Sequence, residues 1–545
     1  MRHVVVETGT GTGPGVNPFA AMLLRDGEAR RRFLDVGEWS PGAIAAIAAG
    51  PPPGRARAAD VVAARNTDGD GQTLQAVEQV RRGTPWYVVA GQQAGLLTGP
   101  LYTVLKAVTA LRLVQALRDA GTDAVALFWV ASEDHDLAEV RTARLLSGAG
   151  EPFTVTAGPG AGASRFPTGP LALGPGAATV EAALETGLAG LPFAGEVRTW
   201  VLGTVRAEAT FAGSFTALMR RLFAGTGLLL FDPLDPAVDG LRREFAARAA
   251  GRHDVLLDAV REDTAAIRAL GFKPRVGFKP ERAFWFHLDE TLGRRRLTRT
   301  GTGGFRADGS GREWDSLERA AADEGARFSP DVLMRPVFQN WLFPVAAVVG
   351  GPGEMAYHAQ LPGLFREMAV GRGLFWPRGS ASVLPAGTLR KLERLGLSAG
   401  DLFEGRVSLL QKGMRVRGET GALERYRETR QAFLRVTGEL EAICAAFTDD
   451  MSRSASTTLN RVRDLEARLE ARLGRETRAR GETVARQVDA LLSEVFPGGK
   501  PQERVLCAPA LVARHGPGLV RDLLEAADPF ERRHAVLVGE KAEGG

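Results

Sequence analysis

The stretch that decides the fold is Trp86-Tyr87-Val88-Val89-Ala90, a short apolar run that ends at the glycine-rich segment GQQAGLLTGPLYTVLKA (91–107). Further runs of the same kind span residues 124–131, 227–231 and 345–349. They are continuous rather than alternating, which is typical of strands buried on both faces of a parallel sheet. Helical stretches such as Leu101–Arg118 lie between them. The pattern therefore predicts a doubly wound α/β core with a Rossmann-like parallel sheet, in which ligands bind beyond the carboxyl ends of the strands.

The glycine-rich segment after the first run is the first predicted binding site. Its glycines let a ligand approach the backbone closely, and Gln92 and Gln93 add amide donors and acceptors. Thr98 is placed to cap the next helix, whose free N–H groups favour a phosphate or carboxylate. Tyr102 and Lys106 lie one turn apart on that helix, so Lys106 can supply a cation. The alternative is a plain strand-to-helix turn, because the segment matches neither common nucleotide-binding glycine motif.

Four ionisable residues follow the second run, in the order Glu133, Asp134, His135 and Asp136. We expect Asp134, His135 and Asp136 to be catalytic, because carboxylates and imidazole accept a proton from an amine nucleophile or bind an ammonium group. Adjacent residues cannot all converge on one ion, so no metal is predicted here. A solvated acidic loop is the alternative interpretation.

A second glycine-rich turn, GGPGE (350–354), follows the last run and opens a helix. Glu354, Tyr357 and Gln360 are one turn apart on that helix, and with Gly351 we expect them to contact substrate.

Two arginines flank the same run. Arg335 ends a stretch that we expect to be extended, and Arg378 follows Trp376-Pro377 just before Ser380. If both arginines reach the same edge of the sheet, they can clamp a carboxylate or phosphate through paired hydrogen bonds, and Ser380 is assigned to the same substrate site. Ordinary surface pairing is the alternative.

A proline-free region predicts a long helical arm. The chain has 30 prolines, yet none lies between Pro385 and Pro497. Apolar residues recur there every seven positions with interleaved ones at +3, namely Tyr426, Phe433, Val436, Leu440, Ile443 and Phe447. Such a seam needs a partner helix, so we expect two antiparallel arms joined by a turn at 448–452. The arm either packs on its own domain or forms a dimer.

The domain organisation follows from these patterns. We predict a core at 1–385 with a flexible glycine-rich insert at about 157–177, a helical coiled-coil arm at 386–500, and a C-terminal segment at 501–545 that returns to the core.

Composition excludes several classes of protein. The chain is 44% hydrophobic and 24% charged, as in ordinary globular proteins, and it has no apolar stretch long enough to cross a membrane. Its net charge of +5 is spread among alternating acids and bases, which does not favour nucleic-acid binding. Two cysteines cannot form a disulfide framework, so a reducing cytoplasm is expected.

The motifs, taken together, resemble a known family. The segments GQQAGLLTGPLYTVLKA (91–107), FWVASEDHDLAEV (128–140), RPVFQNWLFPVAAVVGGPGEMAYHAQL (335–361), PRGSASVL (377–384) and PQERVLCAPALVARHGP (501–517) are similar to those of the cysteine-adding ligase family of bacillithiol biosynthesis. Two positions depart from the family pattern, with Arg275 where a glutamine is usual and His358 where an aromatic is common.

The resemblance implies a function. It implies a Rossmann-like core with inserted connecting segments, a long coiled coil, a homodimer, and the addition of L-cysteine to the glucosamine amine of glucosaminyl malate. It leaves open whether ATP or another nucleotide activates the cysteine. Two other functions stay open, namely an aminoacyl-tRNA-synthetase-like nucleotidyltransferase and a non-catalytic coiled-coil scaffold.

Overall fold

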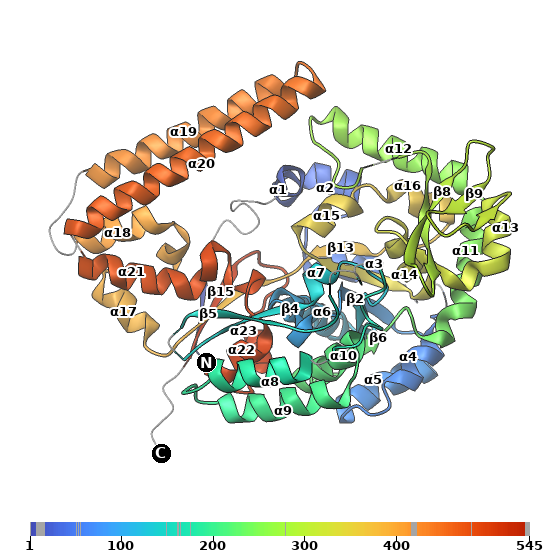
Figure 1. The fold of residues 1–545 in the computed structure, drawn as a ribbon, viewed down its shortest axis with the longest axis horizontal. Coiled ribbons are helices and arrows are strands. Elements are labelled where there is room, and N and C mark those ends of the chain that lie inside the picture. Colours follow the sequence, from blue (N-terminus) through green and yellow to red (C-terminus); the bar gives the residue numbers. More distant parts are fainter. Residues whose placement is uncertain are drawn as a thin grey trace.

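The structure is a computed structural model of the 545-residue chain. It describes residues 2–6, 17–415, 422–480 and 482–539, apart from positions 51, 53, 55, 149, 161, 162, 164, 175 and 278. Three parts are visible in Figure 1: an α/β core, an antiparallel sheet inserted beside it, and a helical domain from which a long hairpin projects.

The core is a five-stranded parallel sheet with the order β13-β12-β2-β3-β6. Its strands are β2 (Trp86–Gln92), β3 (Ala124–Val130), β6 (Leu229–Phe231), β12 (Val345–Gly350) and β13 (Leu374–Pro377). The predicted doubly wound sheet is confirmed, and β13 is an additional strand at its edge. Starting from β2, the chain adds β3 and then β6 toward one edge of the sheet, and it later adds β12 and β13 toward the other edge. The topological switch point therefore lies between β2 and β12.

Residues on both faces of β2 are buried, which explains its uninterrupted apolar run. Val88 and Ala90 belong to the hydrophobic cluster that includes α6 (Tyr102–Asp119). Tyr87 and Val89 belong to a second cluster on the other face, together with α14 (Met334–Leu342). Each of the four side chains is at most 1% exposed. Because α14 begins at Met334, the extended segment predicted before Arg335 is wrong, and Arg335 lies in the first turn of a helix.

The other helices and strands between residues 18 and 368 lie outside the parallel sheet. Apart from those of an inserted antiparallel sheet and its helix, they are α1 (Pro18–Arg25), α2 (Gly27–Leu34), α3 (Pro41–Ile47), α4 (Ala59–Arg65), α5 (Gly71–Arg82), α7 (Leu137–Val140), β4 (Thr142–Leu146), β5 (Pro152–Thr156), α8 (Gly176–Gly187), α9 (Ala194–Ala207), α10 (Phe211–Leu222), α11 (Asp239–Ala250), α12 (His253–Ala269), α15 (Pro352–His358) and α16 (Pro362–Met368).

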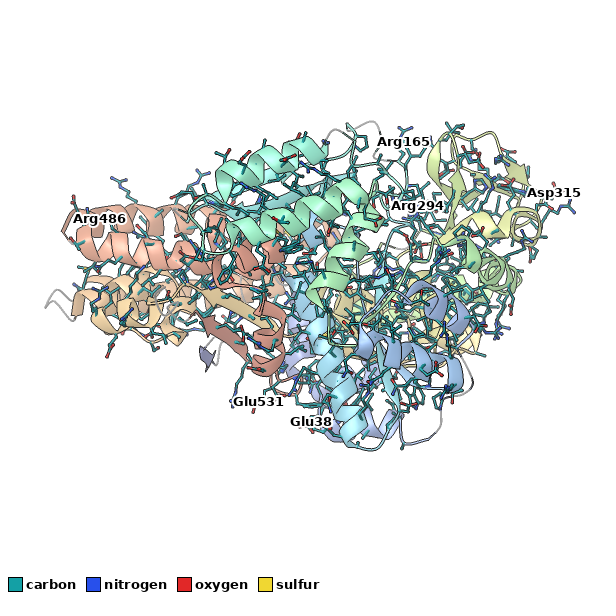
Figure 2. All side chains as sticks on the ribbon, turned by 90° about the horizontal axis from the view of Figure 1, so that it is seen from below. Glu38, Arg165, Arg294, Asp315, Arg486 and Glu531 are labelled. Carbon is teal, nitrogen blue, oxygen red and sulfur yellow. The ribbon has the colours of Figure 1, made fainter. Side chains whose placement is uncertain are left out.

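An antiparallel sheet with the order β10-β9-β8-β7-β11 is inserted before β12. It consists of β7 (Arg282–Asp289), β8 (Gly293–Arg299), β9 (Phe305–Ala307), β10 (Glu313–Trp314) and β11 (Phe328–Pro330), with α13 (Leu317–Glu324) beside it. Arg294 of β8 joins this sheet to the segments that follow β3, since its N–H donates to the Arg165 carbonyl at 2.6 Å and its Nη1 donates to His135 Nδ1 at 3.1 Å. Figure 2 shows both arginines at this junction.

The described part of the glycine-rich insert at 157–177 is hydrogen-bonded to the segment that follows β3. The Thr168 N–H donates to the Asp134 carbonyl at 2.7 Å, and the Gly169 N–H donates to the Ser132 carbonyl at 2.9 Å. Position 169 has no room for a side chain, because a Cβ there would lie 2.4 Å from the Ser132 Cβ. The insert therefore covers the carboxyl end of β3.

The C-terminal segment lies against the core through a small mixed sheet. Strand β15 (His534–Val538) pairs parallel with β14 (Ser380–Leu384) and antiparallel with β1 (Arg2–Val6). Helices α22 (Ala508–His515) and α23 (Leu519–Ala526) precede it, and α23 packs on α6. Residues far apart in sequence thus meet beside the parallel sheet.

The helical domain comprises α17 (Thr388–Arg394), α18 (Arg406–Arg415), α19 (Ala422–Ala445), α20 (Asp449–Arg480) and α21 (Glu482–Val495). Helices α19 and α20 lie side by side as the projecting hairpin (Figure 1). They are antiparallel, because the earlier residue Arg430 of α19 pairs with Glu466 of α20, while the later residue Glu441 pairs with Arg463. Part of the predicted seam is uncovered, since Val436, Leu440 and Ile443 are 45–56% exposed. None of the helices within the described ranges is long and apolar enough to cross a bilayer.

Three buried histidines are held neutral by the fold. Burial lowers the pKa of His253 and His534 to about 4, and that of His515 to about 3. In the unfolded chain each imidazole titrates near its ordinary value of roughly 6.5. The unfolded state therefore binds more protons than the folded state between about pH 6.5 and pH 4, so the folded protein loses stability as the pH falls through this window.

We predict that His253→Leu makes the protein less sensitive to acid. The His253 ring packs on Phe284 and Phe305 at 5.8 and 5.2 Å, and its Nε2 has no hydrogen-bond partner among the described residues. Urea unfolding of the wild type should show a free energy that decreases from pH 6.5 to pH 4.5. In the variant the slope should be smaller by up to about 1.4 kcal/mol per pH unit. Above about pH 7.5 the difference in the free energy of unfolding between the two proteins should no longer change with pH. A difference that stays constant down to about pH 4.5 would contradict the prediction.

Candidate active site

A cleft of about 2070 Å³ opens beyond the carboxyl ends of β2 and β12, at the topological switch point. Its walls come from the core and from the helical and C-terminal parts of the chain. Eleven of the residues predicted from the sequence line it: Gln92, Gln93, Tyr102, Lys106, Asp134, Arg335, Gly351, Glu354, Tyr357, Arg378 and Ser380. The structure thus brings together side chains from all three glycine-flanked strand ends.

Lys106 of α6 connects two of these strand ends. Its Nζ donates to the Gly91 carbonyl and to Gln92 Oε1, both at 2.8 Å, and lies 2.6 Å from Glu354 Oε2. An ammonium group has three protons, so these three acceptors use all of them. Burial lowers the pKa of Lys106, and the Glu354 carboxylate opposes that shift. Glu354 also accepts the Gly351 N–H at 2.8 Å, which begins α15. This lysine therefore orients Gln92 and Glu354 toward the cleft.

Arg378 is anchored to the wall of the cleft from the other side of β12. Its backbone N–H donates to the Gly350 carbonyl at 2.9 Å, and its guanidinium lies 2.6 Å from Glu503 and above the Tyr102 ring at 5.7 Å. Burial alone would lower the pKa of Arg378, but Glu503 raises it above the ordinary value. Arg378 therefore keeps its charge inside the protein.

Arg335 reaches the cleft from α14. The described residues offer its guanidinium one hydrogen bond, from Nη2 to the Tyr357 hydroxyl at 3.5 Å. Burial would lower the pKa of Arg335, but the nearby Tyr357, Asp134 and Glu133 raise it. Burial also raises the pKa of Tyr357 to about 12, so this phenol is protonated at neutral pH. A charged group that is so sparsely hydrogen-bonded is suited to bind a carboxylate or phosphate.

Asp134 and His135 have different environments. Asp134 Oδ2 accepts from Gln93 Nε2 at 2.8 Å, and Oδ1 accepts the His135 N–H at 2.7 Å. Burial would raise the pKa of Asp134, but Arg294 and Arg335 bring it below the ordinary value. His135 does not line the cleft, and its Nδ1 accepts from Arg294 Nη1 at 3.1 Å. Burial and Arg294 lower the pKa of His135, so the ring is neutral.

Thr98 and Asp136, which were also predicted, lie outside the cleft. Thr98 is buried in a short turn with a φ of 74° and does not cap the helix, because Leu101 precedes the first residue of α6. The Leu101 N–H donates to the Leu506 carbonyl, so the free helix end that we expected is partly occupied. Asp136 caps the four-residue helix α7 through the Glu139 N–H at 3.3 Å.

Gln360 also lies outside the cleft, but it holds one wall in place. Its Oε1 accepts the Val276 N–H at 2.9 Å, and its Nε2 donates to the Val276 carbonyl at 3.1 Å. Val276 and Arg275 line the cleft. Gln360 therefore acts on the loop that contains Arg275.

Sequence patterns missed several residues of the site. Glu133 is 1% exposed, and Ser329 Oγ donates to its Oε2 at 3.1 Å, which ties the inserted sheet to the end of β3. Burial raises the pKa of Glu133 and of the cleft residue Glu139. Lys500 at the end of the helical arm also lines the cleft, and the C-terminal segment adds Glu503, Arg504, Arg532, Arg533 and His534. The resemblance in PQERVLCAPALVARHGP was the only sequence signal for this segment.

The described ranges contain no cluster of three or more histidine, cysteine, aspartate or glutamate residues that could hold a metal ion. The cleft instead combines buried cations with carboxylates, a set that suits a substrate with both carboxylate and amine groups.

Relatives of known family have similar sequences along most of the chain. A protein of Salinibacter ruber is 30% identical over 478 residues, covering 86% of this chain and 85% of the relative. Proteins of Solibacter usitatus and Geobacillus thermodenitrificans are each 29% identical and cover 83% and 85% of this chain, and 84% and 86% of the relatives. All three are named "Putative cysteine ligase BshC".

A solved structure of a Campylobacter jejuni protein, described as a "putative arginyl t-RNA synthetase", aligns with 87% of this chain and 98% of its own. It is 9% identical with a TM-score of 0.22, which is too low to support an argument about fold or chemistry.

Two family models match nearly all of the chain between residues 46 and 538. The model described as "Bacillithiol biosynthesis BshC, N-terminal Rossmann-like domain" matches residues 46–379, and "Bacillithiol biosynthesis BshC, C-terminal coiled-coil domain" matches residues 381–538. The cleft lies between the parts of the chain that these two models cover. On this evidence the chain belongs to the BshC family of bacillithiol biosynthesis.

Proposed function

We propose that the protein is a ligase that joins the carboxyl group of L-cysteine to the glucosamine amine of glucosaminyl malate. Family membership supports this reaction, and so does the name shared by the relatives. The observation that carries the proposal is the meeting of Arg335 and Arg378 with Asp134 in one cleft at the switch point. Both substrates combine carboxylate and amine groups, which such a set of charges can bind at opposite ends.

Amide formation from a free carboxylate needs an activated acyl group. We propose that a carboxylate oxygen of cysteine attacks a phosphorus atom of ATP or another nucleoside triphosphate, and that the P–O bond to the nucleoside diphosphate or pyrophosphate breaks. The phosphate or nucleotide left on the acyl group is then the leaving group, and it departs with that carboxylate oxygen. The glycine-flanked strand ends at Gly91 and Gly351, together with Arg378, fit a phosphate close to the backbone. The amine then attacks the acyl carbon, and its proton passes to a base.

We propose the cytoplasm as the location of this reaction, which is supported by two cysteines that are both free.

Each charged residue then has a role that its contacts support. Arg335, with its single long hydrogen bond, binds a malyl carboxylate. Lys106 has no proton to spare and acts by holding Gln92 and Glu354. Asp134 is ionised, borders the cleft and binds the ammonium group of cysteine or the incoming amine. His135 acts indirectly through Arg294, because its Nδ1 is already occupied.

The proposed function is tested by incubating the purified protein with L-cysteine and glucosaminyl malate, with and without ATP, and analysing the products by mass spectrometry. We expect the cysteinyl amide only when all three are present, together with an equal amount of the nucleotide product. Amide formed equally well without ATP would contradict nucleotide activation. No amide under any condition would contradict the ligase, and ATP-dependent labelling of other amino acids would favour the nucleotidyltransferase.

Asp134→Asn should reduce kcat/KM in the same assay by at least about 100-fold, because the amide cannot neutralise an ammonium group or accept its proton. Asp136→Asn is the matched control, since Asp136 is exposed and caps only α7. It should retain activity within about twofold of the wild type. Equal losses in the two variants would remove Asp134 from the proposed mechanism.

We also propose that the protein is a homodimer whose hairpins cover one another. The support is the uncovered seam on α19, where Val436, Leu440 and Ile443 follow one another at spacings of four and three residues. This spacing places them on one helix face, as in the stripe that a partner helix covers.

Light scattering coupled to size-exclusion chromatography tests the dimer. The wild type should have about twice the mass of one chain, and Leu440→Glu combined with Ile443→Glu should shift it to the monomer, because two carboxylates would be buried in an apolar contact. Val255→Glu, at an equally exposed apolar residue on α12, should leave the mass unchanged. A monomeric wild type, or a dimer that survives the double substitution, would exclude this interface.

A further inference from the structure

Glu503 lies at the centre of a hydrogen-bonded network between the C-terminal segment and the cleft. Its Oε1 is 2.6 Å from Arg378 Nη2, and its Oε2 accepts from Ser380 Oγ at 2.8 Å and from the Ala381 N–H at 3.1 Å. The residue is 5% exposed. Burial by itself would raise the pKa of Glu503, but Arg378 brings it to about 2, so the group is a carboxylate at neutral pH.

The hydrogen-bond pattern also determines the tautomer of His534. Ser380 Oγ has one proton and gives it to the Glu503 carboxylate, which can only accept. The contact of 2.7 Å between Ser380 Oγ and His534 Nδ1 therefore requires a proton on Nδ1. Burial lowers the pKa of His534 to about 4, so the ring is neutral at pH 7 and adds no second cation beside Arg378. With its proton on Nδ1, the neutral ring accepts from Ser382 Oγ through Nε2 at 3.0 Å.

Arg378 has donors left over for a ligand of the cleft. Within the described residues, Nη2 donates to Glu503 and Nη1 donates to the Gly379 carbonyl at 2.7 Å, which uses two of the five N–H groups of a guanidinium. Nε lies near the turn at Gly351, where a Cβ would be 3.8 Å from it. Arg378, Gly351 and Tyr102 all line the cleft, so an anion bound there is within reach of this side chain.

We propose that Glu503 is a positioning residue of the ligase site, whose carboxylate, fixed by Ser380 and His534, holds the Arg378 guanidinium in place to bind an anionic group of a substrate. The C-terminal segment is then part of the active site rather than a structural addition to it. The anion is either a carboxylate of glucosaminyl malate or a phosphate of the nucleotide. This inference rests on the proposed function, because it assigns Arg378 to that site.

The test measures KM for glucosaminyl malate and for ATP separately in Glu503→Gln, in Arg378→Gln and in the double variant. If Glu503 acts through Arg378, each single variant should raise KM for the same one substrate by about tenfold or more, with a smaller change in kcat. The double variant should be no worse than Arg378→Gln alone, because residues that act as a unit are not additive. The substrate whose KM increases identifies the anion.

Glu494→Gln is the matched control, because Glu494 pairs with Arg514 at 2.5 Å in the same part of the chain but does not line the cleft. It should leave both KM values within twofold of the wild type. Ser380→Ala, which removes one hydrogen bond to Glu503, should raise KM for the same substrate by a smaller factor, and it replaces Glu503→Gln if that variant does not fold.

Unchanged KM values in Glu503→Gln, or additive losses in the double variant, would overturn the inference. Titration calorimetry with glucosaminyl malate and with ATP separates it from the proposed function. A wild type that forms no amide but binds either ligand, with affinity reduced alike in both single variants, would retain the positioning role and reject the ligase. Binding that is equal in wild type and Glu503→Gln would reject the positioning role even in an active enzyme.

Discussion

The buried ammonium group of Lys106 is the interaction on which the arrangement of the cleft depends. It joins the Gly91 carbonyl at the end of β2 to Glu354 in the first turn after β12, across the point where the sheet reverses its winding. Moving a lysine out of water costs several kcal/mol, and the three acceptors offset this cost only while all are present. The ends of β2 and β12 are therefore held together by the Lys106 ammonium group, which comes from α6.

The same principle operates at the next strand end. Arg378 is buried because Glu503 reaches it from the C-terminal segment, and Glu503 in turn is saturated by Ser380 and the Ala381 N–H. Asp134 is kept ionised by Arg294 from the inserted sheet and by Arg335 from α14. Lys106, Arg378 and Asp134 are thus each stabilised by an element from a distant part of the chain. Arg335 makes one long hydrogen bond within the described residues, which leaves it available for a ligand.

The lining of the cleft explains why the family needs two domains for one reaction. The parallel sheet presents backbone and amide groups, while the helical and C-terminal parts close the opposite wall. A cleft of about 2070 Å³ has room for more than one small substrate, which suits the joining of an amino acid to an amino sugar. Gln360 adds to this enclosure by clamping Val276 against the core.

The sequence by itself determined the parallel sheet, because a strand buried on both faces must be apolar at every position, as Tyr87 to Ala90 are. It also identified the strand ends as the site, and eleven of the residues that line it, because glycine turns and charged residues follow those strands. Tertiary structure alone decided what each residue does. Lys106 looked like a free cation in the sequence but is saturated, His135 is held by Arg294, and Thr98 is buried away from the cleft. Glu503 and His534 showed no local pattern, because their partners lie more than a hundred residues away and are set by strand register and burial rather than by spacing.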